Sequence, residues 1–237
     1  MVDGTPFVMV TPYLFTENFQ SVDDYDNKPY YASFIRFLKY FSFFISIFLP
    51  GLYVAVGTFH QEMLPSTLLF NIATSEVITP FPLMLEAVII FVIYEIMREA
   101  GLRLPKTIGH AVSIIGAIVI GDAMVSAGII GAPMLIVVAL TAMSSYVVYQ
   151  LYEPVSILRI VLILLGGTTG IYGVMVATAL LVVNISSIEV YGVPYTAPIS
   201  PFYKPAMEDT FIRRSWKKLN KRQFKIQDMD GVNIGKE

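Results

Sequence analysis

Residues 98–131 read REAGLRLPKTIGHAVSIIGAIVIGDAMVSAGIIG, a charged turn with a proline that runs into an apolar segment. Small residues recur every four positions in two rows, the first being Gly109, Ser113, Ala117 and Gly121, and the second Ala123, Ala127 and Gly131. Four-residue spacing aligns each row along one side of a helix. In lipid, close backbone approach at small residues is a principal cause of helix association. We therefore predict a membrane helix that packs against protein through these rows.

A carboxylate, Asp122, lies within this predicted helix and shares a strip of its surface with Ile115, Val119 and Ser126. A carboxylate at membrane depth costs roughly 3 kcal/mol unless it meets a partner or water. Two interpretations stay open. Either the strip lines a water-filled path, or Asp122 lies near the membrane surface or is satisfied by a neighbouring helix.

The composition is that of a membrane protein that crosses the bilayer several times. The chain has 237 residues, of which 55% are hydrophobic and 14% charged, with a mean hydropathy of +0.66. An ordinary soluble domain carries more charge than this. Cysteine is absent, which excludes disulfides and thiolate chemistry.

The apolar segments predict an all-α, polytopic transmembrane domain of about five membrane segments, at least one of them broken or re-entrant. The first covers residues 33–59, with Pro50 and Gly51 expected to kink it. Residues 61–75 are shorter than the ~20 apolar residues of a span, so we predict a re-entrant or interfacial helix there. Further segments are predicted at residues 83–100, in the small-residue helix, at 133–149 and at 156–186.

The last of these segments is too long for a simple span. It is longer than the ~30 Å hydrocarbon layer requires at ~1.5 Å per residue. Its GGTTG sequence at residues 166–170 predicts a break. Both one tilted helix and the two halves of a hairpin remain open.

Three regions follow from this pattern. Residues 1–32 begin with β-branched and aromatic residues and continue with a polar, turn-rich stretch at 17–30, and we predict a membrane-proximal connector that is the end of an upstream domain. Residues 33–188 form the transmembrane domain. Residues 189–237 begin with a proline-rich interfacial segment and end in a basic amphipathic tail, with a helix expected over residues 209–224 that faces anionic lipid headgroups.

Three further charged residues are candidates for intramembrane sites: Glu86, Glu95 and Arg98. Arg98 can reach Glu95 three residues earlier, which favours an interfacial ion pair over a transport site. Glu86 is more isolated, and its position one turn after Pro82 is also compatible with an interfacial carboxylate.

Basic residues predict the orientation, because Lys and Arg collect in cytoplasmic loops. The basic residues used for this prediction are Arg36, Lys39, Arg98, Arg103, Lys106 and Arg159. They place the N-terminus and the turn after the 83–100 segment on the cytoplasmic side. The C-terminus is then cytoplasmic as well if the last segment is a hairpin or the 61–75 segment crosses.

The sequence contains no catalytic motif. Only His60 and His110 are present, and no zinc-protease spacing, nucleophile elbow, phosphate-binding loop or dinucleotide fingerprint occurs. We predict no catalytic residue, no metal site and no cofactor. Transport, gating and assembly are the remaining classes of function.

Four stretches resemble the A subunits of the GerA-type germinant receptors of endospore-forming bacteria. They are PYLFTENFQSVDDY at 12–25, LPGLYVAVGTFHQEMLP at 49–65, REAGLRLPKTIGHAVSIIGAIVIGDAMVSAG at 98–128 and YGVPYTAPISPF at 191–202. The third is the most specific block, and the resemblance is collinear from about residue 6 to residue 205.

The resemblance implies a subunit of a nutrient receptor in the spore inner membrane, with a permease-like B subunit and a lipoprotein C subunit as partners. It also implies that the A subunits self-associate and form an ion channel that triggers germination. Members of the family carry a cytoplasmic domain upstream of this region, so the resemblance implies either a fragment of a longer protein or a truncated gene. In such a pore, Ile115 or Val119 would act as a hydrophobic gate. A secondary transporter and a non-conducting assembly scaffold are the alternatives.

Overall fold

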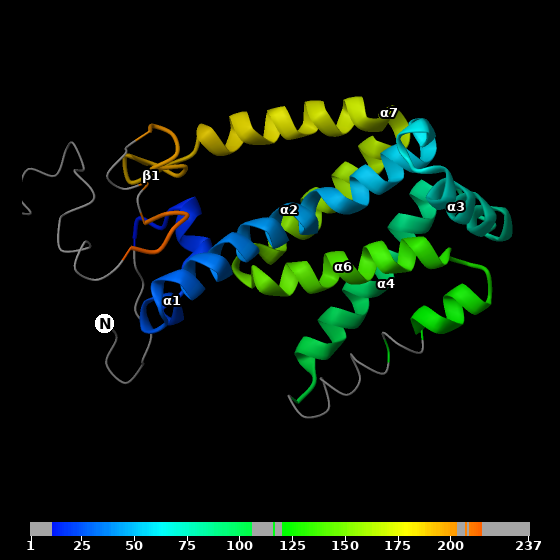
Figure 1. The fold of residues 1–237 in the computed structure, drawn as a ribbon, viewed down its shortest axis with the longest axis horizontal. Helices are drawn as coiled ribbons and strands as arrows, with labels where there is room; N and C mark the ends of the chain where they lie inside the picture. Colours follow the sequence, from blue (N-terminus) through cyan, green and yellow to red (C-terminus); the bar gives the residue numbers. More distant parts are fainter. Residues whose placement is uncertain (1–10, 106–115, 117–119, 203–206, 208, 215–237) are drawn as a thin grey trace, which may run out of the picture. The chain divides into compact units, whose positions relative to one another are not determined.

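The computed structural model describes residues 11–105, 116, 120–202, 207 and 209–214. Within these residues the chain is mostly helical, and the only β structure is one short hairpin, which confirms a helical fold (Figure 1). The chain divides into two compact units. Residues 1–40 and 180–237 form the terminal unit, and residues 41–179 form the helical unit.

Helix α2 (Pro29–Phe59) contains the first predicted span and runs from the terminal unit into the helical unit. It begins at a proline, a residue favoured at the first helical position because its φ is fixed and its missing N–H is not needed there. The helix continues through Pro50, where a kink was predicted. The short 3-10 helix η2 (Gln61–Met63) follows it.

Helices α3 (Ser66–Ile78) and α4 (Leu83–Arg103) form a bent pair with an angle of 77° between them (Figure 1). Residues 79–82 between them contain Pro80 and Pro82, and proline interrupts the helical hydrogen-bond pattern. The bend agrees with the prediction that the segment before α4 is re-entrant or interfacial.

Helix α4 extends three residues beyond the predicted segment at residues 83–100 and continues to Arg103. Leu104 then has φ −83° and ψ 154°, an extended conformation. It precedes Pro105, whose ring excludes the helical conformation for the residue before it. The proline therefore ends this helix.

Residues 120–126 are helical and lead through a turn, in which Gly128 has φ 67°, to α6 (Ala132–Val147). Helix α6 agrees with the predicted segment at 133–149, and its Pro133 lies in the first turn. The 3-10 helix η3 (Tyr149–Leu151) connects α6 to α7 (Tyr152–Ser186).

Helix α7 has a break at Gly170, where φ is 68° and ψ is −153°. Only glycine adopts this combination without strain. Figure 1 shows the change of direction beside the α7 label. The break predicted at residues 166–170 is therefore present, and the last apolar segment consists of two helical arms.

By length and composition, two described helical segments can cross a membrane, Pro29–Phe59 and Tyr149–Ser186. The bent pair α3 and α4 adds a third if it forms one span, and α6 is shorter. Five crossings are therefore not confirmed within the described residues.

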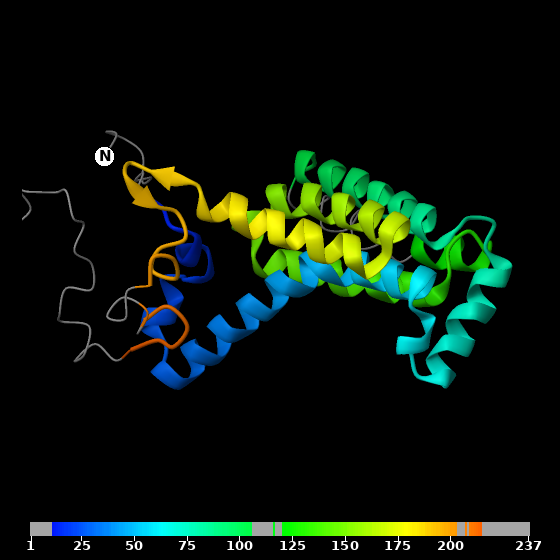
Figure 2. The ribbon, with the colours of Figure 1, turned by 90° about the horizontal axis from the view of Figure 1, so that it is seen from above.

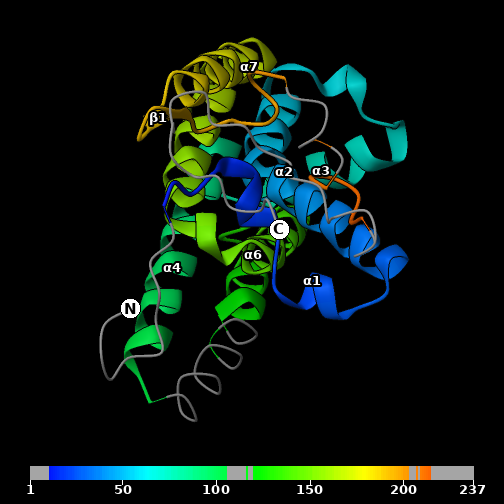
Figure 3. The same cartoon turned by 90° about the vertical axis from the view of Figure 1, so that its left-hand side faces the viewer.

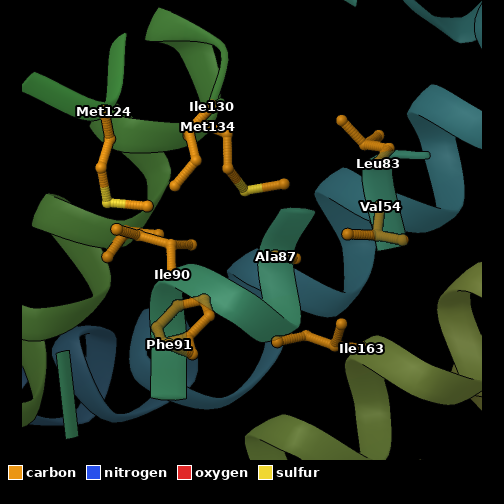
Figure 4. Packing of buried hydrophobic residues seen from close by; sticks show 10 residues of the cluster. Val54, Leu83, Ala87, Ile90, Phe91, Met124, Ile130, Met134 and Ile163 are labelled. Atoms are coloured by element: carbon orange, nitrogen blue, oxygen red, sulfur yellow. The ribbon is translucent and has the colours of Figure 1, made fainter. Parts of the chain in front are cut away.

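The core of the helical unit lies where α2, α4, α6, α7 and the helical residues 120–126 meet (Figure 4). Val54 and Ile163 are fully buried there, and Ala87 and Phe91 of α4 lie between them and the methionines Met124 and Met134. Helix α4 thus contributes the centre of this core.

The terminal unit contains the 3-10 helix η1 (Phe15–Phe19), α1 (Asp23–Asp26) and a hairpin of β1 (Glu189–Val190) and β2 (Val193–Pro194). The hairpin directly follows α7 (Figure 2). Residues 209–214 form turns and bends, so a helix starting at residue 209 is wrong for this part. The rest of the predicted basic tail helix, from residue 215, lies outside the described residues.

Candidate functional site

The predicted pore strip is only partly described by the structure. Ile115 and Val119 lie outside the described residues. Asp122 and Ser126 lie on the helical residues 120–126, and both side chains are exposed, whereas Met124 of the same segment is buried. The strip therefore lies on the side of this segment that faces away from the core of its own chain.

The two small-residue rows have different surroundings. Gly109, Ser113 and Ala117 lie outside the described residues. Gly121 is buried, and a Cβ placed on it would lie 3.4 Å from the methyl groups of Leu135 in α6, an ordinary contact. Ala123 and Ala127 are exposed. The described part of these rows thus packs within the chain at Gly121, and Ala123 and Ala127 are left for other contacts.

Within the described residues, two glycines mark a close approach of helix backbones elsewhere, between α2 and α7. A Cβ on Gly51 would lie 2.9 Å from the carbonyl oxygen of Leu162, and one on Gly166 would overlap the carbonyl oxygen of Gly51. Such contacts are open only to glycine. The sequence signal was present, since Gly51 follows Pro50 and Gly166 lies in the GGTTG stretch, but both were interpreted as signs of bending.

Glu86, one of the predicted intramembrane charges, is 1% exposed on the first turn of α4. Its Oε1 accepts a hydrogen bond of 2.6 Å from the backbone N–H of Gly131, the N-cap of α6. A helix N-terminus favours a negative charge. Gly131, predicted as a packing residue, thus holds this carboxylate at the start of α6.

Glu95 and Arg98 form the ion pair that their spacing predicts, with 2.8 Å between Arg98 Nη2 and Glu95 Oε1. Tyr152 of α7 completes the group, because its hydroxyl donates a 2.6 Å hydrogen bond to Glu95 Oε2. The Arg98 guanidinium carbon lies 3.9 Å from the centroid of the Tyr152 ring. The group therefore connects α4 to α7, and each of the two charged side chains has partners within it.

Arg159 is a buried charge whose position the sequence did not reveal. It was taken to mark a cytoplasmic loop, but it lies inside α7 and is 1% exposed. Its Nε donates to the carbonyl of Ser46 at 3.0 Å and its Nη2 to Ser145 Oγ at 2.5 Å. The guanidinium also lies 5.0 Å from the centroid of Phe91. Arg159 thus connects α2, α4, α6 and α7.

The terminal unit contains a second buried group of charges, the Arg36 cluster, made of Asp24, Arg36, Lys39 and Asp209. Arg36 is 0% exposed, and its Nε lies 3.1 Å from Asp24 Oδ2. Its Nη1 donates to the backbone carbonyl of Asp209, and Lys39 Nζ lies 3.4 Å from Asp24 Oδ1. The cluster therefore fixes the segment after α7 to the start of α2.

Tyr25 joins this cluster through its hydroxyl, which donates a 2.8 Å hydrogen bond to Asp209 Oδ2. Tyr25 lies on α1, the short helix labelled in Figure 3. Burial and this hydrogen bond raise the pKa of Tyr25. Burial also acts to raise the pKa of Asp24, but the hydrogen bonds from Arg36 and Ser21 outweigh it, so the pKa of Asp24 is lowered. At neutral pH the Asp24 carboxyl is therefore ionised and the Tyr25 hydroxyl is neutral.

Within the described residues, no group of three or more His, Cys, Asp or Glu side chains is placed to hold a metal ion. The described part of the chain thus offers charged groups that connect helices, and an exposed polar strip beside a buried glycine.

Known proteins similar to this chain include bacterial spore germination proteins. The chain is 43% identical over 239 residues to spore germination protein KA of Bacillus subtilis, a match that covers 100% of this chain and 44% of that protein. It is 41% identical over 222 residues to the uncharacterized membrane protein YfkQ of Bacillus subtilis, covering 93% of this chain and 43% of that protein.

A third relative, spore germination protein GerLA of Bacillus cereus, is 36% identical over 239 residues, which cover 100% of this chain and 49% of that protein. The chain thus spans less than half the length of these relatives. No solved structure matches it significantly. The model of the Bacillus/Clostridium GerA spore germination protein family matches residues 1–224. The chain therefore belongs to the GerA family of spore germination proteins.

Proposed function

We propose that the chain is the membrane part of an A-type subunit of a nutrient germinant receptor in the spore inner membrane, and that assembled copies conduct ions when a nutrient is sensed. The observation that carries this proposal is the family match over residues 1–224. Two of the relatives named above are called spore germination proteins, which supports the same role.

The arrangement of charges supports a membrane location. Glu95, Arg98 and Arg159 lie on helices that are mostly apolar, and each has a partner inside the helical unit. Paired charges cost far less in lipid than free ones. The partners proposed for the chain are a permease-like B subunit, a lipoprotein C subunit and further copies of itself.

The ion path is proposed along the strip of Asp122 and Ser126. Both side chains are exposed, while the small residue beside them, Gly121, is buried against α6. A ring of copies that places this strip at its centre would line a path with carboxylates, which attract cations. Ile115 and Val119 are proposed to close the path by excluding water. Both chain termini are proposed to be cytoplasmic.

The chain contains no cysteine, so single cysteines give a clean test of this path. Asp122→Cys and Ser126→Cys are introduced into the full reading frame, and the receptor is reconstituted with its partner subunits in liposomes. A cationic, water-soluble thiol reagent should block nutrient-dependent rubidium flux in both variants. The control is Ile157→Cys, at a side chain of α7 that is 67% exposed and outside the strip.

The alternatives give different results. Block at Ile157→Cys equal to that at the strip would contradict the proposed position of the path. Flux that is absent from a correctly assembled receptor would favour the non-conducting scaffold, and nutrient uptake by this chain alone would favour the transporter.

A further inference from the structure

Two carboxylates, Glu86 and Glu76, come together where α3, α4 and the start of α6 meet. A Cβ placed on Gly131 would lie 3.2 Å from the Cβ of Ser75 and 3.4 Å from Glu86 Oε1. The last turn of α3, which carries Ser75 and Glu76, therefore lies against the buried Glu86 carboxylate. The proposed ion path makes no use of this pair.

No positive side chain among the described residues balances the pair. Glu76 acts electrostatically on Glu86, and both act on the hydroxyl of Tyr53 in α2. Among the ion pairs of the described residues, none involves either carboxylate. Like charges repel strongly when they are removed from water, so two such neighbouring carboxylates require a counter-charge or a proton.

Each carboxylate also has an oxygen without a donor. Glu86 Oε1 is satisfied by the N–H of Gly131, but Glu86 Oε2 and Glu76 Oε1 are buried and accept no hydrogen bond from the described residues. Glu86 itself is 1% exposed, so solvent does not satisfy its second oxygen. Buried polar atoms without a partner are uncommon in proteins and indicate a bound water, an ion or a functional role.

We propose that Glu86 and Glu76 bind one monovalent cation of the Na⁺ or K⁺ class between Glu86 Oε2 and Glu76 Oε1. Carboxylate oxygens suit hard cations. Divalent Ca²⁺ takes six to eight oxygen ligands and Mg²⁺ demands an octahedron, whereas this part of the described chain has no third acidic or histidine ligand. The charge left after one monovalent ion is bound is stabilised by the N-terminus of α6.

The surroundings allow such an ion to enter and leave. Glu76 is only half-buried, so the pair opens toward the surface on the α3 side. Ser75 is half-buried beside it, and its hydroxyl donates to the carbonyl of Asn71, which leaves its oxygen free to face a cation. Water completes the coordination at the open side.

The test measures the thermal stability of the purified full-length protein in detergent, at constant ionic strength, while NaCl or KCl replaces N-methylglucamine chloride. A ligand that binds only the folded state raises Tm, and an ion at roughly 100-fold its Kd should raise it by about 5 °C. Glu86→Gln and Glu76→Gln should each abolish this rise. Glu99→Gln is the matched control, since Glu99 is an exposed glutamate of α4 that pairs with Arg103, and it should keep the full rise.

Three outcomes would overturn the proposal. The first is an equal rise for wild type and both variants, and the second is an equal effect of N-methylglucamine. The third is a Tm that changes with pH but not with the cation, together with loss of the pH dependence in Glu86→Gln. That result would assign a shared proton to the pair. The readout is binding and not flux, so it is independent of the proposed ion conduction. Because Glu76 is half-buried on a short helix, its amide variant provides the answer if the variant at Glu86 fails to fold.

Discussion

At the level of single residues, Arg36 is the side chain whose loss should cost the terminal unit most stability. Arg36→Gln would leave Asp24 and Asp209 buried without their shared cation. Removing one partner of a buried ion pair costs about 3 kcal/mol or more. We expect a corresponding fall in the free energy of unfolding of the full-length protein, measured by denaturant titration in detergent.

The control for this prediction is Arg103→Gln on α4. Arg103 also forms an ion pair, with Glu99 at 2.8 Å, but its side chain is 79% exposed. Exposed pairs contribute little because water and salt screen them. Equal losses for the two variants would contradict a special role for the Arg36 cluster.

The same cluster predicts a pH range for the attachment of the segment after α7. The pKa of Asp24 is lowered in the folded chain. Its ionised form therefore stabilises the folded terminal unit above the ordinary aspartate pKa of about 4, and this stabilisation is lost as the pH falls below that value. The pKa of Tyr25 is raised. Its neutral form therefore stabilises the folded terminal unit below the ordinary tyrosine pKa of about 10, and this stabilisation is lost above that value. Proteolytic cleavage near residue 209 should therefore be slow between these limits and accelerate beyond both, whereas a flat profile would contradict the assignment.

Sequence reasoning identified some of these charges and not others, for physical reasons. The pair of Glu95 and Arg98 was predictable because helix geometry brings residues three apart together. The pairing of Arg36 with Asp209 was not, because 173 residues separate them and no local rule relates such positions. Arg159 was misplaced because an arginine near the start of an apolar segment is typical of a loop, whereas here Ser46, Ser145 and Phe91 surround it.

At the level of the helices, the contact between α2 and α7 depends on two glycines. Gly166→Ala would drive a methyl group into the carbonyl of Gly51, and backbone atoms cannot move aside as a side chain does. Overpacking of this kind costs about 1–3 kcal/mol. We expect a lower Tm for Gly166→Ala and a Tm close to wild type for the control Gly121→Ala, whose Cβ would meet only flexible methyl groups of Leu135. The reverse order would contradict the described contact.

The break in α7 gives a further prediction. At Gly170, φ is 68° and ψ is −153°, a backbone conformation that is strained for every residue except glycine. A Cβ at this position would also lie 2.9 Å from the ring of His60. Gly170→Ala should lower the free energy of unfolding by about 1–3 kcal/mol. The neighbouring Thr168→Ala, at an exposed position of the same helix, should change it much less. Both values follow from thermal unfolding of the purified protein.

Helices were easier to predict than their packing. Their positions follow from long apolar runs, and the breaks at Pro80–Pro82 and at Gly170 follow from residues that disfavour a continuous helix. The partners of each face were not predictable. In a membrane protein all helix faces are apolar, so the pattern that distinguishes a buried face in a soluble protein is weak. The glycine contact of α2 with α7 was missed for this reason.

At the level of the whole molecule, the proposal is that the chain acts as part of a nutrient receptor that releases ions from the spore. This combines the membership of the GerA family with helices that can cross a membrane and charges that are paired inside them. The carboxylate pair of Glu86 and Glu76 gives the same chain a place to bind a cation, whether or not the pore itself conducts.

The most direct test of this account is potassium release from spores that lack the gene. The full reading frame containing these residues is deleted, together with redundant receptor genes, and potassium release and loss of refractility are followed across a panel of amino acids and sugars. The account predicts that the response to at least one nutrient disappears and that the intact reading frame restores it. If every nutrient response persists without the gene, the role of the chain in nutrient sensing is contradicted.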